Sequence, residues 1–265
     1  MLQNALIRAW GFAAFFWLLV AGPAHAAPIT AQEILESIKA RARFSASNNA
    51  PACEFRKVMT VEELGKDGVS FKTNEMIYKV VQARGSAQGK LLSTNGKIAP
   101  EKQSGRDRQK SKHGKGKASD SDDDDDLGNP WLNDELMGRF DFALQAEKEL
   151  GLRKVWVLSF EPKLEDLPRN NFMDRFLNRL HGEIWVDQAE SEVSFLEISL
   201  INQVKVWGGI LGQLEEMAFK IHRQSVAGGV WVQSSSEGMF VARKLLSTMR
   251  FRTREETSGY RLIDQ

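Results

Sequence analysis

Apolar residues near the start of the chain recur at the spacing of a helix. Ile34, Leu35, Ile38 and Ala42 fall on one side of a helical projection. The tetrapeptide at residues 30–33, Thr-Ala-Gln-Glu, has the sequence of a capping box, in which the threonine hydroxyl and the glutamate carboxylate satisfy free backbone N–H groups. The pattern predicts one amphipathic helix, and its apolar side needs a surface to cover.

From residue 53 onward the apolar period changes to two, which is typical of half-buried strands. The alternation is clear at residues 53–62, 140–147, 196–206 and 216–222, while residues 69–83 and 239–251 are extended in character. Residues 155–160 are apolar on both faces, as in a central strand that is covered on each side. Turn signals separate the runs, including Asn95-Gly96, and residues 130–137 indicate a short helical turn.

These runs contain far more strand than helix and show no alternation of helix with strand, which excludes a doubly wound fold. Consecutive strands are expected to pair antiparallel. The sequence therefore predicts a mainly β (α+β) domain built on an antiparallel sheet.

The first 26 residues have the composition of an export signal. Arg8 precedes an apolar run at residues 9–20, and Ala24-His25-Ala26 supplies a small-residue cleavage site. A membrane anchor is the alternative, but the run is shorter than the roughly 20 residues of a spanning helix. We expect cleavage after Ala26, a single domain at residues 27–265 with no membrane span, and a periplasmic or secreted location.

Residues 101–126 are almost free of apolar side chains and end in an unbroken run of aspartates. This composition cannot bury enough apolar surface to offset the entropy of ordering, so it predicts a disordered charged insert. Calcium binding by the aspartates is the alternative, but a calcium loop spaces its ligands and turns on glycine.

The remaining chemistry favours binding over catalysis. The formal net charge is +1, and a nucleic-acid-binding protein would be expected to carry a larger basic excess, so we expect no nucleic-acid partner. The sequence has no nucleophile elbow, phosphate-binding loop or dinucleotide fingerprint, and His113, His181 and His222 lack the spacing of metal ligands. Cys53 is the single cysteine, and its place in an apolar alternation favours burial over a reactive thiol. We therefore expect no enzyme activity, no cofactor and no metal.

Several segments resemble a known group of exported bacterial proteins. The most specific is residues 180–187, Leu-His-Gly-Glu-Ile-Trp-Val-Asp; residues 140–142, 156–162, 197–206, 208–209, 229–232 and 260–261 are also similar. The group is the LolA-like superfamily, described as similar to outer-membrane lipoprotein-sorting proteins. The resemblance implies a strongly curved antiparallel sheet, an unclosed half-barrel, whose concave apolar face is covered by helices and can hold acyl chains.

The resulting hypothesis is a non-catalytic binding protein, possibly a lipoprotein carrier, that holds a lipid or lipoprotein acyl chain by burial alone. The alternative is an envelope regulatory protein that senses lipid and docks a protein partner through the charged insert. A second alternative for the lining residues is that they fill a closed core. The predicted lining residues are Phe142, Leu144, Trp156, Leu158, Phe160, Ile184, Val186, Leu196, Ile198, Leu200, Met217, Phe219 and Ile221.

Overall fold

The computed structural model describes residues 28–46, 51–84, 86–98, 134–165, 167–206, 212–244 and 247–263. The predicted export signal, the charged insert, Gly208 and Gly209 lie outside these residues. The elements are α1 (Ala31–Ser45), β1 (Ala52–Leu64), β2 (Ser70–Ala83), β3 (Ser86–Thr94), β4 (Lys97–Ile98), α2 (Asp134–Met137), β5 (Phe140–Leu150), β6 (Arg153–Pro162), α3 (Phe172–Leu177), β7 (Leu180–Asp187), β8 (Val193–Leu200), β9 (Val204–Val206), β10 (Gly212–Ser225), the 3₁₀ turn η3 (Ala227–Gly229), β11 (Trp231–Lys244) and β12 (Ser247–Ile263).

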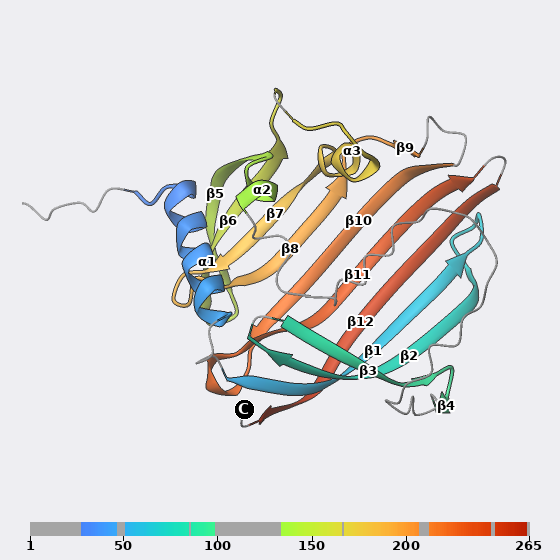
Figure 1. Cartoon of the computed structure of the whole chain (residues 1–265), viewed down its shortest axis with the longest axis horizontal. Coiled ribbons are helices and arrows are strands. Elements are labelled where there is room, and N and C mark those ends of the chain that lie inside the picture. The colour runs from blue at the N-terminus through green and yellow to red at the C-terminus, as the bar shows by residue number, and fades with distance from the viewer. Residues whose placement is uncertain are drawn as a thin grey trace, which may run out of the picture.

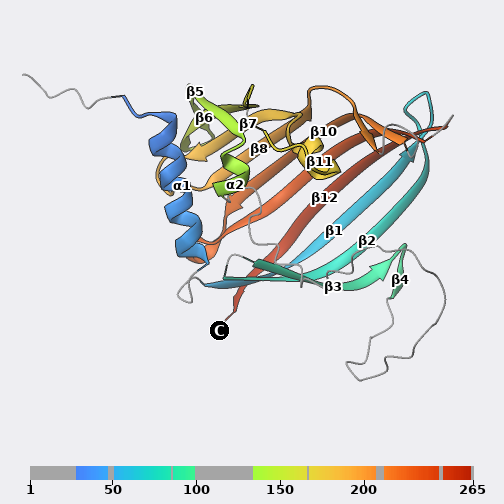
Figure 2. The same ribbon diagram turned by 45° about the horizontal axis from the view of Figure 1, so that its top comes forward.

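The strands form one large antiparallel sheet that is not closed into a barrel (Figure 1). Its order is β4-β3-β2-β1-β12-β11-β10-β8-β7-β6-β5, and β9 pairs with β10. The first and last long strands, β1 and β12, pair with each other and join the two halves of the chain. The sheet curves strongly, and α1 and α2 lie on its inner side against β5–β8 (Figure 2). The predicted half-barrel fold is confirmed.

Helix α1 begins as the sequence predicts. The Thr30 hydroxyl accepts a hydrogen bond from the Glu33 backbone N–H at 3.2 Å, and the Glu33 carboxylate accepts one from the Thr30 N–H at 2.8 Å. Ile34, Leu35 and Ile38 are buried by the sheet, so the amphipathic pattern sets which side of the helix faces the strands.

Strand β6 is buried on both faces, as predicted, but it lies next to the edge strand β5 and not at the centre of the sheet. On one face Leu158 packs under α1. On the other face the register places Trp185 beside Val157, and the Trp185 ring contacts Phe195, which in turn contacts His222 at 4.8 Å between ring centroids. His222 thus has a packing role.

The prediction of one continuous strand at residues 196–206 is wrong, because the structure has two strands there, β8 and β9. Leu180 begins β7 and pairs with Leu200, so β8 has no neighbour on that side beyond this point. Ile201 instead donates its backbone N–H to the carbonyl of Arg179, and the chain resumes pairing at Val204 against β10.

Cys53 is buried, which confirms the structural interpretation of this residue. It packs in a second apolar cluster with Phe55, Val80, Val230 and Val232, where β1 and β2 meet the start of β11. Burial raises the pKa of the Cys53 thiol and so disfavours the reactive thiolate.

A buried ion pair fixes α3 to the start of β5. Arg139 donates to Asp174 at 2.9 Å, and the backbone N–H of Asn170 donates to the same carboxylate at 3.0 Å. Burial alone would raise the pKa of Asp174, but these hydrogen bonds outweigh it, and the pKa lies below its ordinary value.

Because the folded-state pKa of Asp174 is depressed, the pair stabilises the fold above the unfolded-state pKa of about 4, and this contribution is lost as pH falls through the folded-state pKa. We expect the difference in unfolding free energy between wild type and Asp174→Asn to be largest at neutral pH and to shrink in acid. Urea titrations of both proteins at neutral and acidic pH measure it, and a difference that is constant with pH contradicts the assignment.

Candidate functional site

The predicted lining residues gather on the inner face of the sheet beneath α1. Twelve of the thirteen belong to one apolar cluster, and Ile34, Leu35 and Ile38 of the helix pack into it. Five are buried, so under the helix this face is packed. The buried five are Leu158, Phe160, Val186, Leu196 and Ile198, and the partly buried seven are Phe142, Leu144, Trp156, Ile184, Leu200, Met217 and Ile221.

The same face continues beyond the helix onto β10, β11, β12 and β1. Phe219, the thirteenth residue, pairs with Ile198 of β8, and its ring lies 6.5 Å from that of Phe240. Cross-strand pairing extends two rows of side chains over this face, and most of their apolar members are partly exposed. One row is Ile198, Phe219, Gly238, Thr253 and Val61, and the next is Leu196, Ile221, Ser236, Glu255, Met59 and Met76.

The opposite face of these strands is charged. Lys220 pairs with Glu197 at 3.1 Å and Arg254 with Glu237 at 3.8 Å, in a row that runs across β8, β10, β11 and β12. Alternation of this kind assigns one face to water and the other to apolar contacts. The inner face is therefore the apolar side of these four strands.

The Lys57–Glu255 ion pair lies within the apolar face. Lys57 lies 3.5 Å from Glu255, which also accepts a hydrogen bond from Gln233 at 2.6 Å, and the Lys57 ammonium lies 5.7 Å from the centre of the Tyr78 ring. Since the two charges are paired, this part of the face presents no net charge to a ligand.

Gly238 lets aromatic side chains close over the backbone at the middle of the face. A Cβ atom at this position would lie 2.5 Å from the Thr253 hydroxyl, 2.7 Å from the Phe240 ring and 2.8 Å from the Phe219 ring. These contacts are too short for any side chain to fit without displacing its neighbours.

We therefore expect Gly238→Ala to lower the unfolding free energy by about 1–3 kcal/mol, the usual cost of overpacking. Urea denaturation measures this effect. Gly89→Ala is the matched control on β3, because its Cβ would meet side-chain atoms only at 3.6 Å or beyond. Equal stability of the two variants would contradict the assignment of Gly238 to a crowded site.

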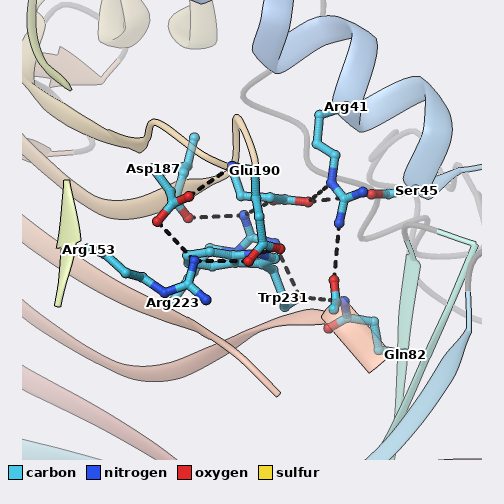
Figure 3. A network of polar contacts seen from close by, with 11 residues as sticks. Arg41, Ser45, Gln82, Arg153, Asp187, Glu190, Arg223 and Trp231 are labelled. Carbon is cyan, nitrogen blue, oxygen red and sulfur yellow. Dashed lines mark hydrogen bonds and ion pairs between the residues drawn. The ribbon is translucent and has the colours of Figure 1, made fainter. Parts of the chain in front are cut away.

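A polar network joins the C-terminal part of α1 to three parts of the sheet (Figure 3). Glu192, before β8, accepts from Arg41 of α1 at 2.9 Å and from Arg223 of β10 at 3.0 Å. Arg41 also donates to the carbonyl of Gly229, and Arg223 and Gln82 both donate to the carbonyl of Trp231.

The second half of the network surrounds Arg153 at the start of β6. Its guanidinium donates to Asp187 and Glu190, both at 2.9 Å, and lies 5.1 Å from the centre of the Trp231 ring. The hydrogen bonds to Asp187 and Glu190 raise the pKa of Arg153. Three arginines thus meet three carboxylates, and the network is a clasp between helix and sheet with its charges balanced.

Two groups of residues at the site are not predicted by the sequence patterns. Phe240 and Phe251 pair with each other on the inner face, and the apolar character of residues 239–251 was the available signal for them. The clasp residues Arg41, Glu192 and Arg223 have no such signal, because they come from three distant segments.

Within the described ranges, no group of three or more His, Cys, Asp or Glu residues is placed to hold a metal ion. In the same part of the chain, none of the helices is long and apolar enough to cross a membrane.

Comparison with known proteins gives no sequence family. No family model and no curated protein matches the chain. Among solved structures, a LolA superfamily protein from Nitrosomonas europaea is 14% identical over 90% of this chain and 96% of its own, with a TM-score of 0.36.

Two further structures are similar at the same low level. A putative outer membrane lipoprotein-sorting protein domain from Vibrio parahaemolyticus is 12% identical over 86% of this chain and 91% of its own, with a TM-score of 0.39. In the MucA/MucB complex of Pseudomonas aeruginosa, the matching chain is 9% identical over 88% of this chain and 99% of its own, with a TM-score of 0.27. The resemblance predicted from sequence is confirmed as a likeness to LolA superfamily and lipoprotein-sorting structures, at low identity and low TM-score.

Proposed function

We propose that this chain is a non-catalytic periplasmic protein that binds a hydrophobic ligand, such as a lipid or a lipoprotein acyl chain, on the inner face of its sheet. The observation that carries the proposal is the continuity of the apolar face. It starts in the packed cluster under α1 and extends to Met217, Phe219, Ile221 and Phe240, which are partly exposed.

In this proposal the two parts of the face have different roles. The buried residues under α1, including Leu158 and Ile198, form the fixed wall. The ligand lies along β10, β11 and β12, where side chains are still partly open to water. Each methylene group that is buried there contributes about 0.8 kcal/mol, so one acyl chain binds without a charged clamp.

The first test is native mass spectrometry of the chain from Ala27 onward, purified gently from the periplasm, followed by lipid extraction. We expect a co-purifying species that bears an acyl chain. Protein that is empty and that also takes up no fluorescent fatty acid would overturn the proposal.

A pair of variants on one strand locates the site. Phe240 and Met239 are neighbours on β11 that point to opposite faces and are both partly exposed. We expect Phe240→Gln to weaken fatty-acid binding by about tenfold to a hundredfold, because roughly 1.5–3 kcal/mol of aromatic burial is lost. Met239→Gln should bind like wild type in the same fluorescence titration. Equal weakening in both variants places the ligand elsewhere.

The alternative function, docking of an envelope protein partner through the charged insert, concerns residues outside those that the structure describes. A pull-down from envelope extract with and without residues 101–126 tests it. Equal recovery of a partner removes the insert from the interaction.

A further inference from the structure

The β1–β2 hairpin ends in two large apolar side chains that lie in water. Val69 is 63% exposed and Phe71 is 70% exposed. The strand register runs from the Glu63–Lys72 pair directly to the Leu64–Ser70 pair, so Phe71 is the extra residue of a β-bulge. A bulge re-aims a side chain, and here it leaves Phe71 in solvent while Leu64 is buried.

A second hairpin ends beside the first. Leu64 also pairs with Arg250 of β12, and Met249 pairs with Ala242 of β11, so the ends of the β11–β12 and β1–β2 hairpins are neighbours on the sheet (Figure 1). Adjacent strands lie about 5 Å apart, which puts Ser70 and Arg250 about 10 Å apart across β1. Met249 is exposed as well. We call residues 62–73, 241–244 and 247–252 the hairpin rim.

The hairpin rim carries an excess of positive charge. Lys72 and Arg252 pair with Glu63 and Glu62 of the rim itself, and Arg243 pairs with Glu215 of the neighbouring strand β10 at 2.9 Å. Among the described residues, Lys66, Lys244 and Arg250 have no carboxylate within ion-pair distance. The six basic residues are Lys66, Lys72, Arg243, Lys244, Arg250 and Arg252, and the three acidic residues are Glu62, Glu63 and Asp67.

Exposed aromatic and aliphatic side chains that are flanked by basic groups are suited to the boundary between lipid headgroups and acyl chains. The apolar groups leave water there, and the cations approach anionic headgroups. A protein partner fits less well, because a stable protein interface buries about 800 Å² on each side and a tip of two large side chains supplies only a fraction of that area.

We propose that the hairpin rim docks the protein on an anionic lipid bilayer, with Phe71 and Val69 entering the headgroup boundary and the basic residues contacting the headgroups. This surface is separate from the inner face of the sheet, and the proposal does not depend on ligand binding there.

The test is flotation of the chain from Ala27 onward with vesicles of phosphatidylglycerol and phosphatidylcholine. We expect binding that weakens with added salt and is weaker on vesicles of phosphatidylcholine alone. The double variant Phe71→Ser, Val69→Ser should lower the partition coefficient by about tenfold or more. Leu152→Ser is the matched control, because Leu152 is fully exposed on the β5–β6 hairpin, away from the rim.

The conservative single variant Phe71→Leu should keep most of the wild-type binding to vesicles. The double variant should still take up fatty-acid probe like wild type. The proposal is overturned if wild type does not bind the anionic vesicles, if the double variant binds as wild type does, or if Leu152→Ser loses as much binding as the double variant. Failure of fatty-acid binding alone would count against the ligand proposal and leave this one standing.

Discussion

Replacing Leu158 with alanine should lower the unfolding free energy by about 3–4 kcal/mol, the largest effect that we expect from a single truncation in this protein. Leu158 has 0% exposure and belongs to the cluster under α1. The surrounding side chains come from the helix and from neighbouring strands, so they can close only part of the cavity that the truncation leaves.

Leu152→Ala supplies the matched control for this measurement. Leu152 is the same residue type on the hairpin that leads into the same strand, but it is fully exposed, so its truncation should change the unfolding free energy by less than about 0.5 kcal/mol. Urea denaturation of both variants gives the comparison. A loss at Leu158 of less than about 1.5 kcal/mol would mean that the face beneath α1 is loosely packed and open to a ligand.

The sequence predicted local structure well wherever one face of an element is buried. Helix α1 and its capping box followed from the period of Ile34, Leu35 and Ile38 and from Thr30 and Glu33. One-sided burial fixes the face of a strand in the same way, which is why twelve of the predicted lining residues lie together.

The sequence does not predict which strands pair when they lie far apart along the chain. The alternation along β1 states which side chains share a face, but it does not state that the partner is β12, about two hundred residues away at Ile263. For the same reason the inner face was predicted only as far as Phe219. Phe240 and Phe251 join it through the pairing of β10 with β11 and of β11 with β12.

The clasp is a second feature that the sequence alone does not predict. Arg41, Glu192 and Arg223 are individually ordinary charged residues in the sequence, and charged residues in general favour solvent. Only the three-dimensional arrangement shows that Glu192 has just 8% exposure and that its two oxygens accept from arginines on two different elements. The contribution of Glu192 to stability therefore depends on contacts made in the folded structure, and the sequence alone does not predict it.

Glu192→Ala should lower the unfolding free energy by about 2–3 kcal/mol and release the C-terminal part of α1. Removing the carboxylate leaves two arginines without their shared partner, which in a fully buried pair costs about 3–5 kcal/mol. Arg41 and Arg223 retain some exposure, so solvent screening reduces that cost. Because the Gly229 carbonyl of η3 is then the remaining hydrogen-bond acceptor for Arg41 among the described residues, we expect faster amide hydrogen exchange in α1.

Glu237→Ala is the control, since Glu237 is exposed and lies 3.8 Å from Arg254 on the outer face. An exposed pair of this kind contributes at most about 1 kcal/mol, so stability and exchange in α1 should stay close to those of wild type. Exchange in α1 that is unchanged in Glu192→Ala would show that the apolar contacts of Ile34, Leu35 and Ile38 hold the helix by themselves. Faster exchange combined with faster uptake of fatty-acid probe would assign α1 the role of a cover over the inner face, held in place by the clasp.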